Sequence, residues 1–181
     1  LEISDMWQST ESLEALSKLE GIELVPYSTR LVQNVFFNTT IAPTDDVNFR
    51  KALSSLLDYE MLVNDIFVDS RTNYGPVSSY TAGSVNTTQY EYDLEKAKEY
   101  LDKGLEELGI TKEELESHLT FLTGESDVAK KQAAAIQNMW KQNLGIEAEI
   151  ESVAFKIRID RYNRKDYTTT FAGWGGDYND P

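Results

Sequence analysis

The segment FAGWGGDYNDP, residues 171–181, gathers the residue types best suited to holding a charged ligand. Trp174 lies between Gly173 and Gly175, so the backbone there can bend sharply and approach a bound molecule closely. Asp177 follows shortly after, and a carboxylate so placed can hold a cation such as an amine through a charge-assisted hydrogen bond. The structural alternatives are core packing for the tryptophan and a turn or capping role for the aspartate.

Catalytic chemistry finds little support elsewhere in the chain. His118 is the sole histidine, expected to be structural at the start of an apolar strand, and there is no cysteine. Disulfides, thiol catalysis and cysteine-based zinc sites are therefore excluded. The sequence DYND, residues 177–180, spaces its oxygens like the opening of a calcium loop but lacks that loop's glycine and glutamate. We expect no enzyme, no metal site and no cofactor; an acid/base hydrolase using Asp177 and Asp180 is the enzymatic alternative.

The charge balance narrows the possible partners. The chain has 181 residues and a net charge of −14, a field that repels nucleic acid and anionic membranes. No apolar run approaches the ~20 residues of a membrane-spanning helix. Hydrophobic residues make up 40% and charged residues 27%, which indicates one globular domain. An acidic face that binds another protein is a further alternative.

Periodic patterns place the aromatic and acidic segment at the end of a strand. The sequence YTTTFAGW, residues 167–174, predicts a strand that runs directly into the glycines. Further strands are predicted at residues 1–4, 22–27, 31–37, 118–123 and 146–153, and helices at 11–19, 47–58, 59–67, 93–109, 126–145 and 156–164. Residues 69–89 read as a long loop. Strands and helices mixed along one chain predict an α/β domain around a single sheet.

Local signals mark several helix ends and core positions. Asp58 is predicted to cap a helix, and Thr111 with Glu114 forms a capping box. Gly145 is predicted to end the longest helix. The positions predicted to face the core include Val47, Leu53, Leu56, Leu57, Ile136, Met139, Trp140 and Leu144.

Two segments together resemble the peptide/nickel-type solute-binding proteins of ABC importers, the oligopeptide- and dipeptide-binding family known as family 5. The first is VFFNTTIAPTDDVNFRKALSSLLDYEMLVNDIF, with the family's aromatic strand, Pro-Asp loop and basic helix carried by Phe36, Phe37, Asn38, Pro43, Asp46, Arg50, Ala52, Leu53 and Asp58. The second joins IQNMWKQNLGIEAEIESV to the ending, where the glycines, Trp174, Asp177, Tyr178, Asp180 and Pro181 match the family's signature. The chain departs from the family pattern at Tyr59, where a basic residue is usual, and at Phe171, where an arginine can stand.

The resemblance implies one lobe of a type II (cluster C) periplasmic-binding-protein-like fold, an α/β domain with a central mixed sheet flanked by helices. Residues 1–181 would be a single domain, the C-terminal lobe of a two-lobe protein, cut at both hinge crossings. The missing N-terminal lobe would be its partner in enclosing the ligand.

The resemblance also implies the function of a receptor that captures oligopeptides for import. Asp177 would hold the peptide's α-amino group and Trp174 would line the pocket, with Gly173, Gly175 and Phe171 as further ligand contacts. The partners would be an ABC permease and ATPase, reached through the full-length protein. Its place would be the outer face of the bacterial cell membrane, as a lipoprotein, or the periplasm. A nickel chelate, heme, a sugar or a signalling peptide are alternative ligands.

Overall fold

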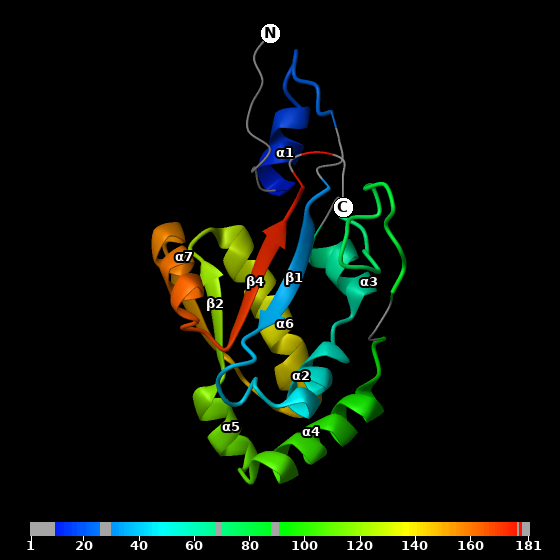
Figure 1. Cartoon of the computed structure of the whole chain (residues 1–181). Coiled ribbons are helices and arrows are strands. Elements are labelled where there is room, and N and C mark those ends of the chain that lie inside the picture. Colours follow the sequence, from blue (N-terminus) through cyan, green and yellow to red (C-terminus); the bar gives the residue numbers. More distant parts are fainter. Residues whose placement is uncertain (1–9, 26–29, 68–69, 88–90, 177, 179–181) are drawn as a thin grey trace.

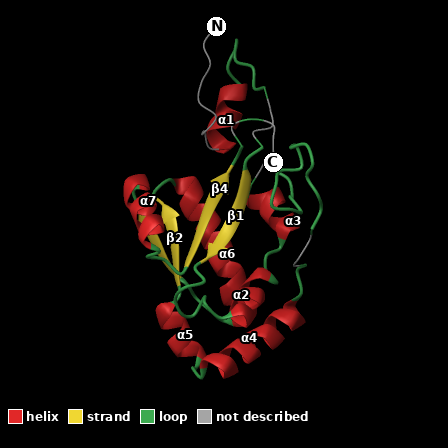
Figure 2. Cartoon of the chain, viewed as in Figure 1, coloured by secondary structure: helices red, strands yellow, loops and turns green. Residues whose placement is uncertain are grey.

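The structure is a computed structural model that describes residues 10–25, 30–67, 70–87, 91–176 and 178. It contains a sheet of four strands in the order β1-β4-β2-β3, with helices packed around it (Figures 1 and 2). The strands are β1 (Val32–Phe37), β2 (Thr120–Gly124), β3 (Glu149–Val153) and β4 (Thr169–Trp174). Strands β2, β3 and β4 run parallel, and β1 is antiparallel to β4. The predicted α/β class with a mixed sheet is confirmed.

Helices cover both faces of the sheet and one of its ends (Figure 2). They are α1 (Thr10–Ser17), α2 (Val47–Ser54), α3 (Tyr59–Met61), the π-helix η1 (Leu62–Ile66), α4 (Leu94–Leu108), α5 (Lys112–His118), α6 (Asp127–Leu144) and α7 (Phe155–Arg164). On one face, Trp140 of α6 packs against Phe121 of β2. On the other face, Tyr162 of α7 shares a hydrogen bond with Thr170 of β4. None of the helices in the described ranges is long and apolar enough to cross a membrane.

The helix ends follow the predicted capping chemistry. The Asp58 carboxylate accepts a hydrogen bond from the Met61 amide at 3.0 Å. Both halves of the Thr111–Glu114 capping box are present at the start of α5. Gly145 takes the left-handed conformation that closes α6. These ends depend only on neighbouring residues, which is why sequence alone could locate them.

Some predicted elements differ from the structure. Residues 22–25 form no strand, residues 26–29 lie outside the described ranges, and so does the strand predicted at 1–4. The strand predicted from residue 118 begins at Thr120, because the helix begun by the capping box continues through His118. His118 is therefore the last residue of a helix rather than the first of a strand.

The predicted core positions Leu53, Leu56 and Leu57 are confirmed as buried, but the prediction is wrong at Val47 in the first turn of α2. Val47 is 46% exposed, whereas Phe49 is fully buried. The apolar positions that point inward are Phe49, Ala52, Leu53 and Leu56. Their spacing of three, four and seven residues is the true helical stripe, which begins after the Asp46 cap.

Gly104 lies where α4 meets the beginning of α2. A methyl group there would stand 2.9 Å from Oδ1 of Asp46 and 3.2 Å from the backbone nitrogen of Phe49. Replacing a helical glycine with alanine ordinarily stabilises a protein by ~1 kcal/mol. Here we expect Gly104→Ala to destabilise the fold by about 1–2 kcal/mol, because the cap and backbone of α2 must shift. Urea denaturation would measure the change in the free energy of unfolding. Glu106→Ala, on the exposed side of the same helix, is the control. A Gly104→Ala variant that is more stable than the unmodified protein would contradict the close packing.

Candidate ligand-binding site

The carboxyl ends of three strands and the beginning of the fourth lie together on one side of the sheet, which we call the strand-end edge. Strand β4 ends at Trp174, which pairs with Val32 at the beginning of the antiparallel strand β1. Because β2 and β3 run parallel to β4, their carboxyl ends lie at this edge too. The edge is the upper end of the sheet in Figure 1, with α1 beyond it. In open α/β sheets, ligands bind outside the carboxyl ends of the strands.

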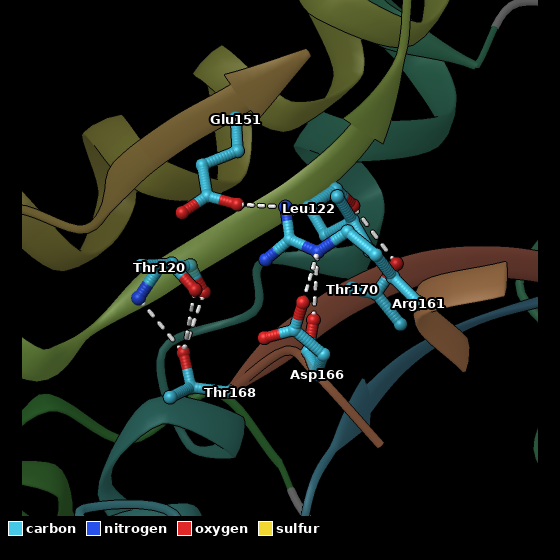
Figure 3. A network of polar contacts seen from close by, with 7 residues as sticks. All are labelled: Thr120, Leu122, Glu151, Arg161, Asp166, Thr168 and Thr170. Carbon is cyan, nitrogen blue, oxygen red and sulfur yellow. Dashed lines mark hydrogen bonds and ion pairs between the residues drawn. The ribbon is translucent and has the colours of Figure 1, made fainter. Parts of the chain in front are cut away.

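A polar network at the opposite end of β4 fixes that strand in place (Figure 3). Arg161 of α7 forms ion pairs with Glu151 of β3 and with Asp166, and its side chain is largely buried. The network thereby ties α7 to β3 and to the turn that leads into β4.

Threonine hydroxyls connect β4 to β2 over a short length of backbone pairing. Thr168 accepts a hydrogen bond from the Thr120 amide and donates one to the Thr120 carbonyl, both at 2.7 Å. Thr170 donates to the Leu122 carbonyl at 2.8 Å (Figure 3). Burial raises the pKa of the nearby Tyr167 phenol above its ordinary value. The segment before Trp174 is thus firmly anchored.

The two aromatic side chains predicted for the site lie on opposite faces of β4. Phe171 is half-buried, and its ring lies 5.2 Å from that of Phe67, against the core. Trp174 is 78% exposed, so core packing does not account for it. Of these two rings, that of Trp174 is the one accessible from solvent, and its contact with a ligand stays a prediction.

The glycines beside Trp174 leave room for a neighbouring strand. A methyl group on Gly173 would lie 3.0 Å from Cδ1 of Leu31, and one on Gly175 would lie 3.4 Å from Cα of Leu31. Neither glycine has the positive φ that favours this residue type. Gly173 therefore lets the Leu31 side chain pack closely, whereas a methyl group on Gly175 would make only an ordinary contact. The predicted contact of both glycines with a ligand stays a prediction.

The predicted anchor of the site, Asp177, lies outside the described residues, as do Asp180 and Pro181. Tyr178, between them, is 72% exposed. Across the part of the chain that the structure describes, no three His, Asp or Glu side chains are placed to hold a metal ion. The role of the Asp177 carboxylate accordingly stays a prediction.

One cationic residue near this edge was missed by sequence reasoning. Arg158 of α7 lies beside Gly124 at the end of β2, where a methyl group on the glycine would come 3.2 Å from Nη1 of the arginine. The sequence does place Arg158 and Tyr162 on one side of the helix predicted at 156–164, and Phe155 directly precedes that helix. Only the folded chain shows which strand end that side faces.

The comparison with known proteins identifies the lobe. Residues 2–181 match the family described as "Bacterial extracellular solute-binding proteins, family 5 Middle". The chain belongs to this family of solute-binding proteins. The oligopeptide-binding protein OppA of Bacillus subtilis is 34% identical over 176 residues, which cover 95% of this chain and 32% of that protein. The periplasmic oligopeptide-binding protein OppA of Salmonella typhimurium is 31% identical over 192 residues, covering 98% and 34% respectively.

Solved structures agree with the fold of this solute-binding lobe. A crystal structure titled peptide ABC transporter, peptide-binding protein, superposes with a TM-score of 0.71 at 31% identity, over 83% of this chain and 70% of that one. Listeria monocytogenes OppA bound to peptide gives 0.73 at 25% identity, over 84% and 32%. The predicted type II periplasmic-binding-protein-like lobe is confirmed. The chain spans about a third of the length of these curated relatives.

Proposed function

We propose that this chain is the ligand-binding lobe of an ABC-importer receptor that captures oligopeptides. The observation that carries the proposal is the exposed Trp174 ring at the edge where the strands of a family 5 lobe end. Relatives named oligopeptide-binding proteins, one of them solved with bound peptide, support peptide as the ligand class. The role is binding rather than catalysis.

A second lobe would complete the site. The beginning of β1 and the end of β4 lie side by side, so two chain crossings to another lobe can leave from one place. Hinge closure would then bring the second lobe over the edge that carries Trp174. We propose that the protein containing this chain has two such lobes, with residues 1–181 forming the C-terminal one.

The chemistry of the edge suits a peptide backbone. An α-amine is protonated below its pKa of ~8, and a carboxylate at Asp177 would pair with it strongly once closure excludes water. Strand-like hydrogen bonds to the peptide backbone give affinity without demanding particular side chains. The Trp174 indole would cover the bound chain, with Gly173 and Gly175 beside it. The Phe171 ring packs against Phe67 on the other face of β4, so it would support this segment from behind and would not line the same wall.

The remaining partners follow from the importer role. The full-length receptor would deliver its cargo to an ABC permease coupled to an ATPase. It would act outside the cytoplasmic membrane, either in the periplasm, as in the Salmonella relative's name, or as a lipoprotein.

Calorimetry tests the proposal directly. Titrating tri- to pentapeptides into the full-length two-lobe protein should show binding. The isolated chain should bind at least roughly a hundredfold more weakly, since half of the enclosing contacts are missing. Equal affinity of the two proteins would refute the need for a second lobe. Binding of a nickel chelate, heme or a sugar in place of peptides would overturn the ligand class.

Replacing Trp174 with alanine separates binding from folding. Because the ring is exposed, the free energy of unfolding should change by less than about 0.5 kcal/mol. Peptide affinity of the full-length protein should fall by about 2 kcal/mol, the loss typical of an interface hot spot. Tyr92→Ala, at an exposed aromatic beside the start of α4, is the matched control and should leave affinity unchanged. Unchanged affinity of Trp174→Ala would remove the indole from the site.

A further inference from the structure

A hollow of ≈ 320 Å³ lies where β2 ends and where α6 and α7 begin. Its lining residues are Gly124, Glu125, Ser126, Ala129, Phe155 and Arg158. The Phe155 ring is 69% exposed, so one wall of the hollow is open to solvent. The cationic group of the hollow is the Arg158 guanidinium.

Arg158 lacks the ionic partner that the other two arginines of α7 have. Its Nε atom is buried without a hydrogen-bond partner, and no ion pair joins it to another described residue, including the Glu125 that shares the hollow. On the same helix, Arg161 pairs with Glu151 and Arg164 pairs with Asp160.

What sets Arg158 apart is a buried donor without a partner in a chain rich in acidic side chains. There are 31 aspartate and glutamate residues against 17 lysine and arginine residues, so acceptors for a guanidinium are plentiful. Instead, the Arg158 guanidinium lies 5.6 Å from the Phe155 ring centre and 5.9 Å from that of Tyr162. A buried donor left unsatisfied costs free energy and calls for an explanation. The terminal nitrogens of the same guanidinium border the hollow, where an external acceptor can reach them.

The hollow lies on the same edge as Trp174. In the parallel register of β2 and β4, Leu122 pairs with Thr170, so Gly124 is level with Ala172. Trp174 is therefore one strand away and about 7 Å further along. An extended peptide advances about 3.3–3.5 Å per residue, so a few residues can reach from the indole to the hollow.

We propose that Arg158 receives a carboxylate of the bound peptide, either the terminal carboxylate or an acidic side chain. The planar guanidinium can offer two parallel N–H donors to the two carboxylate oxygens, a geometry that lysine cannot reproduce. Gly124 leaves the space that the guanidinium occupies. This inference rests on the proposed peptide-binding function and adds a charge preference to it.

The experiment compares peptides that differ only in this charge. Full-length protein is titrated with a peptide free of acidic side chains, with its C-terminal amide, and with the amide carrying one glutamate. We expect the free acid to bind roughly ten- to a hundredfold more tightly than the amide, the effect of one charge-assisted hydrogen-bonded pair. Affinity regained by the glutamate-containing amide would show that the subsite also accepts a side-chain carboxylate; affinity not regained would restrict it to the terminal carboxylate.

Variants of α7 assign the preference to one residue. Arg158→Gln should bind acid and amide equally, and Arg158→Lys should retain part of the preference. Arg164→Gln removes the same charge from an exposed position on the same helix and should keep the full preference, which controls for net charge and steering. Circular dichroism would verify that each variant folds.

The two proposals fail in different ways. If peptides bind but Arg158→Gln keeps the acid-over-amide preference within about twofold of the unmodified protein, Arg158 is not the carboxylate subsite. If the unmodified protein prefers neither the free acid nor the glutamate-containing amide over the plain amide, the same conclusion follows. If it binds none of the peptides, the peptide-binding function itself is overturned, and this inference with it.

Discussion

Replacing Trp140 with alanine is expected to lower the free energy of unfolding by about 3–5 kcal/mol. The indole is fully buried between the sheet and α2, with its ring 5.8 Å from Phe121 and 6.4 Å from Phe37. Its Nε1 donates a hydrogen bond to the Leu53 carbonyl at 3.1 Å. Truncation would open a large cavity at the junction of three elements. Since whole domains are stable by only about 5–15 kcal/mol, the variant should be close to unfolding at physiological temperature.

Urea denaturation followed by circular dichroism measures this loss. Trp140→Phe is the informative comparison, because it keeps most of the ring volume but removes the donor to Leu53; we expect a cost of about 1–3 kcal/mol. An alanine variant that lost less than about 1 kcal/mol would show that the core collapses around the gap. It would then place the packing centre of the lobe elsewhere.

Features set by neighbouring residues could be predicted from the sequence. Asp58 and the Thr111–Glu114 box begin helices, and Gly145 ends one, through contacts within a few residues. Each is found where expected. The central Trp140 was also recognised, because its helix shows a clear apolar stripe. Such signals are complete within a single element and need no knowledge of the tertiary fold.

Features set by packing between elements could not be predicted. The exposure of Val47 and burial of Phe49 depend on how α2 rests against α4, and periodicity alone left the phase of that helix open. The close packing at Gly173 is due to Leu31, which is brought there by pairing of β1 with β4. The position of Arg158 beside Gly124 likewise depends on packing between elements.

The candidate site contains one feature that the sequence indicated and one that only the structure shows. The residue types around Trp174 indicated a binding segment, and the structure places its indole in solvent at the strand-end edge. The absence of a described carboxylate partner for Arg158 emerges only after α7 packs beside β2. The sequence therefore indicated the segment around Trp174, whereas the position of the Arg158 charge could be found only from the structure.

Replacing Asp177 with asparagine is expected to weaken peptide binding to the full-length protein by about 2–5 kcal/mol, or roughly thirty- to several-thousand-fold. The substitution keeps the shape of the side chain but removes the charge that would neutralise the peptide's α-amine. The pairing requires a protonated amine, so affinity should decline as the pH rises above the amine pKa of ~8 in free peptide. In the Asp177→Asn variant that decline should largely vanish. Isothermal titration calorimetry at several pH values measures both effects.

An N-acetylated peptide completes a double-mutant cycle. Acetylation removes the amine charge, so it should weaken binding to the unmodified protein about as much as Asp177→Asn does, and should cost the variant little more. Asp102→Asn, on the exposed side of α4 at the far end of the lobe in Figure 1, lowers the net negative charge equally and should change neither affinity nor its pH dependence. Additive losses from acetylation and Asp177→Asn would show that the two groups do not meet. The amine would then be held by another residue, and the pairing proposed for Asp177 would be wrong.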